Sequence, residues 1–380
     1  MLNAKSLDTR SNELLVSLLT DDSNINTTLL GCPSCPHYSV CGGLSIKDSA
    51  FDCFDFCCGN PNSCTRMCRN NPTRFVAQAR EIGGYRFDHI ARTSACDYKL
   101  NDEIVPLIYH GSSRSMPLAG STFALRLSDL VNFRKGRIRF HSRSELCDAY
   151  GINSTAEIIL SGVDHDHRIE AWWSLGGKRS KIIESFIDLG IRLVTAPNYS
   201  VLLDNPRTDD LYAMSRIAIV FAEFQQVGLA CALHPNGRTM RDFERWSDFI
   251  VSRPEISVLA YEFITGPGSK FRRQFHLDRL ADLARTADRK IDIIVRGDPN
   301  VIPFLRQHFY RVIYIDTTAF MKTIHRQRAE RVANNILQWN SSPTLIGDTV
   351  DILMKNNIDE QMAFLRATYF GDNLSLSKAA

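Results

Sequence analysis

Long hydrophobic runs, a strong net charge and a leader-like N-terminus are all missing from this chain of 380 residues. No apolar run approaches the roughly 20 residues that a helix needs to cross a bilayer. The first residues, MLNAKSLDTRSNELL, contain neither the apolar stretch nor the small-residue cleavage site of a secretory signal. We therefore expect a cytoplasmic protein with no membrane-bound part. The net charge of +3 is too small to indicate a nucleic-acid partner by itself.

From about residue 103, short apolar runs alternate with longer amphipathic stretches. This alternation predicts parallel strands joined by helices. The apolar runs lie at residues 105–109, 157–162, 191–196, 229–233, 256–261, 291–295, 312–316 and 344–348. Eight such units fit a (β/α)8 barrel, the TIM-like α/β fold that we predict for residues 103–370.

Two features of this region leave alternatives open. A doubly wound open sheet would give the same alternation, but no GxGxxG follows the first predicted strand, which weakens a dinucleotide-binding version. The long first crossover contains TFALRLSDL (122–130), which is either an extra strand or an excursion over the barrel mouth. The stretch 318–339 has a helical pattern and is predicted to be one helix.

Cysteine is distributed unevenly, since eight of the eleven cysteines lie between Cys32 and Cys68. Residues 31–75 contain few aliphatic side chains and need a staple to fold, whereas residues 1–30 predict only a tail with a short helix. Without an export signal the thiols should stay reduced, so the cluster favours metal over disulfides. The candidate ligands are Cys32, Cys35, Cys41, Cys53, Cys57, Cys58, Cys64 and Cys68.

The spacing Cys32-x2-Cys35-x5-Cys41-Gly-Gly resembles the auxiliary-cluster segments called SPASM in radical SAM enzymes and, more loosely, the cysteine runs of ferredoxins. The resemblance implies a bound [4Fe–4S] cluster, with a structural zinc ion as the alternative. The CxxxCxxC loop of radical SAM enzymes is absent, because position 60 is Asn where a third cysteine would follow Cys53 and Cys57. We therefore expect no cleavage of S-adenosylmethionine.

Polar side chains follow nearly every predicted strand, and in a barrel these positions meet at one mouth. The candidate catalytic residues are Asp164, His165, His167, His234, Glu262, Arg296, Asp298 and Asp316. The alternative is that strand-to-helix loops are polar in any case and that their aspartates cap helices, which applies to Asp298 and Asp316 in particular.

Two site chemistries are open. His110, His165, His167, His234 and Asp316 could bind a divalent metal that activates water. The HxH at 165–167 resembles the metal motif of amidohydrolases, although in that family it belongs to the first barrel strand.

In the second chemistry a carboxylate acts as nucleophile or general base while Arg114 and Arg296 hold an anionic group. Nucleobase transglycosylases use carboxylates in this way on a similar barrel with a zinc-binding cysteine cluster, a resemblance at the level of the fold.

The segment RKGRIRFHSR (134–143) is strongly basic and could follow a phosphate backbone, unless it is simply a solvated surface. Its candidate nucleic-acid contacts are Arg134, Lys135, Arg137, Arg139 and Arg143. The leading hypothesis is an enzyme that acts on a nucleotide, nucleobase or nucleic acid at the barrel mouth. The alternatives are a metal-dependent hydrolase of a small polar substrate and a non-catalytic nucleic-acid-binding or scaffold protein.

Overall fold

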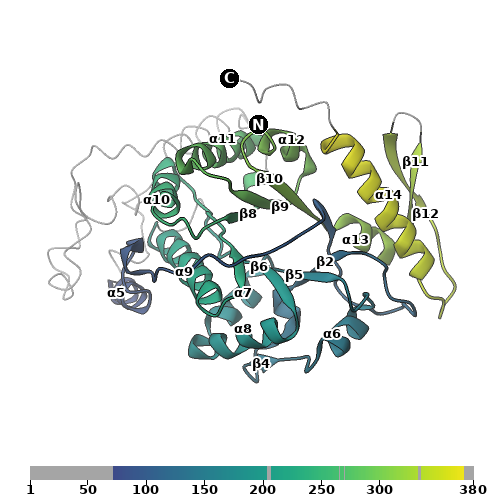
Figure 1. Cartoon of the computed structure of the whole chain (residues 1–380), viewed down its shortest axis with the longest axis horizontal. Helices are drawn as coiled ribbons and strands as arrows, with labels where there is room; N and C mark the ends of the chain where they lie inside the picture. Colours follow the sequence, from purple (N-terminus) through teal and green to yellow (C-terminus); the bar gives the residue numbers. More distant parts are fainter. Residues whose placement is uncertain (1–71, 203–206, 265, 269, 333–334, 372–380) are drawn as a thin grey trace, which may run out of the picture. The chain divides into compact units, whose positions relative to one another are not determined.

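The computed structural model describes residues 72–202, 207–264, 266–268, 270–332 and 335–371 (Figure 1). The predicted N-terminal tail, the cysteine module up to residue 71 and all eight candidate cysteine ligands lie outside the described residues. None of the helices in the described ranges has the length and apolar character to cross a membrane.

The chain divides into two compact units. The helical unit consists of the residues up to Arg92 together with Tyr199–Ala222 and Pro235–Arg253. The sheet unit consists of Thr93–Asn198, Glu223–His234 and the chain from Pro254 onward.

The helical unit contains α5 (Pro72–Glu81), the 3-10 turn η2 (Phe87–His89), most of α9 (Arg207–Gln226) and α10 (Met240–Val251). Helix α10 begins with a capping box, in which the Thr239 hydroxyl accepts from the Asp242 amide and the Asp242 carboxylate accepts from the Thr239 amide. The ion pair Arg238–Asp210, with 3.0 Å between Nη1 and Oδ2, joins the start of α10 to the start of α9. Both side chains are only 1% exposed, so the charges are removed from water together.

The sheet unit contains two four-stranded parallel sheets. The first has the order β1 (Ile104–Pro106), β10 (Arg311–Asp316), β9 (Asp292–Gly297) and β8 (Val258–Phe263). The second has the order β2 (Thr122–Arg126), β5 (Glu157–Ser161), β6 (Ile191–Thr195) and β7 (Ala230–Ala232). Every neighbouring pair within these sheets is parallel, so the parallel α/β organisation predicted from the alternation is confirmed.

Two isolated parallel bridges lie between strands of the two sheets. Leu107, just after β1, bridges to Ala124 of β2, and Leu233, just after β7, bridges to Leu259 of β8. The backbone amide of Ile108 donates to the Ala124 carbonyl at 2.9 Å, and that of Ala260 donates to Leu233 at 2.7 Å.

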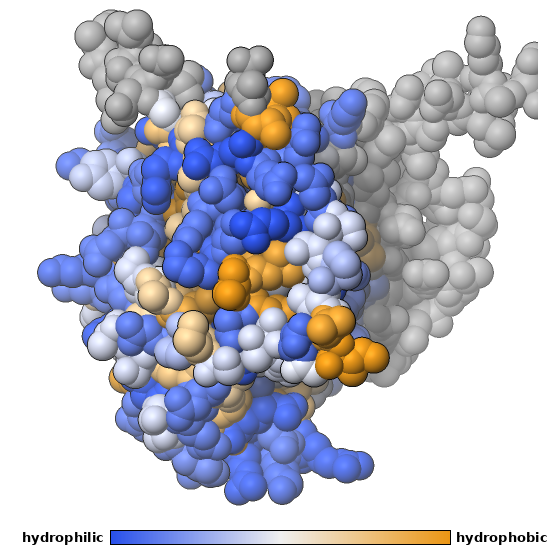
Figure 2. Space-filling model, turned by 90° about the vertical axis from the view of Figure 1, so that its right-hand side faces the viewer, coloured by the Kyte–Doolittle hydropathy of each residue, from blue (hydrophilic) through white to orange (hydrophobic). Residues whose placement is uncertain are grey.

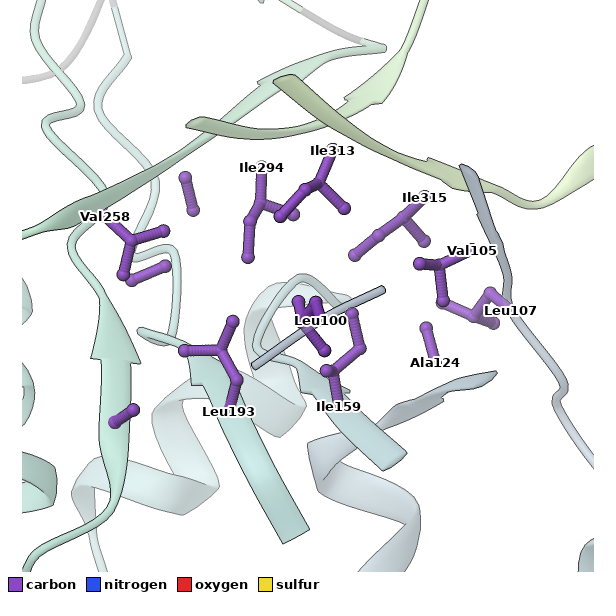
Figure 3. Close-up of a cluster of buried hydrophobic side chains, with 13 residues drawn as sticks. Leu100, Val105, Leu107, Ala124, Ile159, Leu193, Val258, Ile294, Ile313 and Ile315 are labelled. Carbon is purple, nitrogen blue, oxygen red and sulfur yellow. The ribbon is translucent and has the colours of Figure 1, made fainter. Parts of the chain in front are cut away.

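One hydrophobic cluster receives side chains from both sheets (Figure 3). Its thirteen residues are Leu100, Val105, Leu107, Ala124, Ile159, Leu193, Ala230, Ala232, Val258, Ala260, Ile294, Ile313 and Ile315. In Figure 3 the labelled side chains from the two sheets point toward one another, with Leu100 among them. Successive residues of a strand alternate between its two faces, so these side chains mark one face of each strand, called here the core face.

The helices of the sheet unit follow the strands in the chain. They are α6 (Arg143–Tyr150), α7 (Asp166–Trp173), α8 (Arg179–Asp188), α11 (Lys270–Ala287), α12 (Ile302–Leu305), α13 (Thr318–Ile324) and α14 (Asp351–Tyr369). Short 3-10 turns follow β2 (η3, Leu127–Leu130) and β9 (η6, Pro299–Val301). The basic segment carries the two-residue strand β4 (Arg137–Ile138), paired with β3 (Val131–Asn132).

Two predicted elements are wrong. The run 344–348 is not a strand, and the strand that the prediction missed is β2, within the first crossover. Leu345 and Ile346 are 79% and 107% exposed, whereas Phe123, Ala124 and Leu125 are fully buried. Hydrophobicity alone could not separate the two runs, because only the second one has a partner strand on each side.

The predicted helix 318–339 is also wrong beyond Ile324. The chain turns at Arg326, whose φ of 55° ends the helix, and continues as the antiparallel hairpin of β11 (Gln327–Val332) and β12 (Ile336–Ser341). Figure 2 views the side of the molecule on which this hairpin and α14 lie in Figure 1, and shows separate hydrophobic groups on a mainly hydrophilic surface.

Candidate functional site

Strand alternation identifies the side chains that extend the core face beyond its last apolar residue. Each lies two residues after a core residue of the same strand, so it shares that residue's face. These side chains, called here the strand-end layer, are Tyr109, Arg126, Ser161, Thr195, His234, Glu262 and Arg296. All of them are polar, directly beyond a core made only of aliphatic residues.

Glu262 and Arg296 form the centre of this layer. They are register partners on β8 and β9, and both are half-buried. The Asn198 amide donates to Glu262 Oε2 at 3.5 Å. Burial raises the pKa of Glu262, and the opposing effects of Arg296 and Asn198 are smaller.

Arg296 keeps donor capacity unused. Its Nη1 donates to the carbonyl of Val163 at 3.2 Å, but its buried Nε has no hydrogen-bond partner among the described residues. A guanidinium has five N–H donors and binds carboxylates and phosphates through two of them at once. The pair therefore combines a carboxyl with a raised pKa and an adjacent cation able to hold an anion.

His234 lies in the same layer, at the end of β7. It is 2% exposed, and burial lowers its pKa to about 3, so the imidazole is neutral at physiological pH. Its Nδ1 has no hydrogen-bond partner within the described ranges, and its ring lies 5.9 Å from that of Tyr261. A neutral imidazole can donate or accept one hydrogen bond but cannot supply positive charge.

Asp164 belongs to a closed charge network and not to the strand-end layer. Arg126 and Arg168 contact Asp129 at 2.6 and 2.7 Å, and both lie within 3.8 Å of Asp164. The Asp164 side chain is only 4% exposed. Two arginines and two aspartates neutralise one another, so Asp164 has a structural partner set of its own.

Asp316 and Asp298 have the capping roles of the alternative interpretation. Asp316 is 1% exposed and accepts from the Ala319 amide and from Gln361 Nε2, both at 3.0 Å. Burial raises the pKa of Asp316, against the effect of these hydrogen bonds. Asp298 caps η6 through the Asn300 amide and forms an ion pair of 2.7 Å with Arg273.

The candidate histidines are not brought together. His165 and His167 are exposed at the start of α7, with their rings stacked 5.9 Å apart. His110 is exposed in the loop after β1, with its ring 5.0 Å from Phe320. Among the described residues no three His, Cys, Asp or Glu side chains are grouped as a metal site requires. The set of His110, His165, His167, His234 and Asp316 is therefore not assembled as a ligand shell.

The basic segment separates into two kinds of arginine. Arg134, Lys135, Arg137 and Arg139 are exposed. Arg143 is half-buried and donates to the carbonyls of residues 154, 189 and 190 at 2.9 to 3.1 Å, so its guanidinium holds the backbone together. Arg114 likewise donates to the Gly151 carbonyl at 3.0 Å and stabilises the loop after β1.

Sequence reasoning missed Arg126, Asn198 and Tyr109. Arg126 lies over the Tyr109 ring at 4.8 Å, and Asn198 is the partner of Glu262. Arg126 was missed because β2 was not counted as a principal strand. Strand alternation, applied from each core residue toward the strand end, would have found Arg126 and Tyr109.

Comparison of the chain with protein-family models gave no match, and the search of curated proteins gave none either.

Proposed function

We propose that this protein is an enzyme that acts on a nucleotide, nucleobase or nucleic acid at the carboxyl ends of the strands of a (β/α)8 barrel. We further propose that the cysteine module carries a [4Fe–4S] cluster, with zinc as the alternative. The observation that carries the proposal of activity is the pairing of Glu262 with Arg296 on the core face.

The two bridges support closure of the two sheets into one barrel. Followed through the sheets and the bridges, the strand order is β1, β2, β5, β6, β7, β8, β9, β10 and again β1. This is the order of the strands in the chain, as in a (β/α)8 barrel. The shared core supports the same arrangement, because all eight strands contribute to it.

In such a barrel β5 and β9 are four strands apart and therefore face each other. The bond from Arg296 on β9 to the Val163 carbonyl beyond β5 then crosses the mouth. Barrel enzymes place their chemistry at this end of the strands. A guanidinium across the mouth can hold a phosphate, and the carboxyl of Glu262 beside it can transfer a proton to or from a base or hydroxyl.

The proposal is tested by incubating the full-length protein, purified without oxygen, with nucleoside monophosphates, the corresponding nucleosides, and single-stranded DNA and RNA, and identifying products by mass spectrometry. Arg296→Gln should raise KM for the phosphorylated substrate about 10-fold, as expected for one charge-assisted hydrogen bond. KM for the matching nucleoside should change much less. Failure of the unmodified protein to convert any of these compounds would contradict the proposed activity.

The cluster is tested separately. Protein purified anaerobically should be brown with a broad visible absorption band, and Cys32→Ala or Cys35→Ala should remove the band. A colourless protein with stoichiometric zinc would favour the zinc alternative, and a protein with neither metal would contradict the module. Loss of the site should also lower stability, because metal-binding free energy is folding free energy in a segment with little core.

A further inference from the structure

A second cavity lies entirely within the helical unit, between the segment around η2 and the C-terminal half of α10. It has a volume of about 620 Å³. Its charged lining consists of Arg86, Arg92, Arg245, Arg253, Asp88 and Asp248. The volume lies in the range of small-molecule sites, and the formal charge of the lining is positive by two.

The cavity is held in shape by contacts that do not involve a ligand. Arg253, 5% exposed, donates to the carbonyls of Ala91 and Ile90, and Arg92 donates to the Ser252 carbonyl. These bonds fasten the chain after η2 to the end of α10. A site that exists before binding loses less free energy to ordering when the ligand arrives.

One wall of the cavity is aromatic. Phe87 packs edge-on against Phe249 with 5.2 Å between ring centroids, and Trp246 lies behind it at 4.8 Å. The guanidinium of Arg253 lies over the Phe249 ring at 4.4 Å. Phe87 is half-buried, so part of its ring remains accessible beside the arginines.

We propose that this cavity binds a nucleoside phosphate. Arginine forks bind phosphate oxygens through two hydrogen bonds, and arginine and phenylalanine both stack on planar rings. The carboxylates of Asp88 and Asp248 accept hydrogen bonds from ribose hydroxyls or from a base amino group. A ligand with an anionic end, a planar ring and several donors satisfies all three parts of the lining, whereas a simple anion leaves the aromatic wall and the carboxylates unused. None of these residues belongs to the strand-end layer, so the inference does not rest on the activity proposed above.

The test is calorimetric titration of the full-length protein with adenosine 5′-monophosphate. We expect a dissociation constant of about 100 μM or lower, and binding at least 10-fold weaker for adenosine or inorganic phosphate alone. Oligonucleotides with and without a 5′-phosphate show whether the natural ligand is a free nucleotide or the end of a chain. Either source supports the proposal if the phosphate is required.

Arg86→Gln and Arg245→Gln should each weaken binding about 10-fold, the value of one charge-assisted hydrogen bond. Arg285→Gln, at a position whose side chain is 74% exposed on α11, is the matched control and should leave binding unchanged. Arg86 is itself exposed, so its variant folds even if Arg245→Gln does not.

Arg296→Gln distinguishes this cavity from the strand-end layer. If Arg296→Gln abolishes binding while Arg86→Gln and Arg245→Gln leave it intact, the nucleotide binds at the strand ends and the cavity proposal is overturned. Absence of binding in the unmodified protein, or equal affinity for inorganic phosphate, overturns it as well.

Discussion

Glu262 and Asp316 are both carboxylates at the ends of parallel strands in the same sheet, and burial raises the pKa of both. Asp316 points away from the core face, where a helix amide and the Gln361 side chain use its two oxygens. Glu262 lies on the core face, where its neighbours are an amide at 3.5 Å and a guanidinium with an unused donor. The difference between them is one position in the alternation of a strand. A polar residue at a strand end is thus structural or available to a ligand according to the face on which it lies.

The largest effect should come from Glu262→Gln, which we expect to lower kcat about 100-fold or more on the substrate identified above, because an amide can neither accept nor deliver the proton. Stability should not fall. Burial raises the pKa of Glu262, so its charge is unfavourable in the folded protein at neutral pH, and the amide removes that cost. Stopped assays and urea unfolding measure the two quantities. The comparison variant is Asp298→Asn, which keeps the cap and should retain activity within a few-fold. Equal loss of activity in both variants would break the distinction between the two faces.

Asp316→Ala should have the opposite phenotype, with a loss of about 2–3 kcal/mol in the free energy of unfolding. The variant removes a helix cap, worth about 1 kcal/mol, and leaves the buried Gln361 amide without its acceptor, which costs a further 1–3 kcal/mol. Urea denaturation monitored by circular dichroism gives the value. Asp348→Ala is the control, since Asp348 is exposed and its removal should cost less than about 0.5 kcal/mol.

His234 sharpens the comparison through pH. Its folded pKa of about 3 lies below the unfolded value of 6.5, so the unfolded chain binds the extra proton first as the pH falls. Stability is therefore complete above about pH 6.5 and decreases below it by up to about 1.4 kcal/mol per pH unit. His234→Gln should flatten this dependence between pH 6.5 and 4. His165→Gln, at an exposed position, should leave it unchanged. An identical pH dependence in the His234 variant would show that this side chain is hydrated.

The smallest effect extends the same distinction to arginine. Arg137→Ala and Arg139→Ala together should weaken binding to single-stranded nucleic acid and reduce its salt slope by roughly 1.4, because each lost phosphate contact releases fewer counterions. Their stability should stay within about 0.5 kcal/mol of the unmodified protein. Arg143→Ala should instead destabilise the fold, since its guanidinium holds three backbone carbonyls. Filter binding at several salt concentrations measures the slope, and a slope unchanged in the double variant would contradict the role of this segment.

The amino-acid sequence by itself determined the parallel α/β organisation, because alternating buried strands and amphipathic helices are a local property of the chain. Seven of the eight predicted apolar runs contain strands. Sequence also identified Glu262 and Arg296 as candidates from their position at strand ends. It could not distinguish β2 from the run 344–348, since both are apolar and differ only in whether a neighbouring strand is present to pair with them.

Tertiary structure decided which polar strand ends are available. Asp164 is neutralised by Arg126 and Arg168, which come from different elements, and Asp316 is satisfied by Gln361, 45 residues later in the chain. Asn198 becomes the partner of Glu262 across 64 residues. Such pairings depend on which segments the fold brings together, and hydrogen bonds over these separations leave no periodic signal in the sequence. The physical reason is that periodicity encodes the face of an element, whereas the partner across that face is set only when the elements pack.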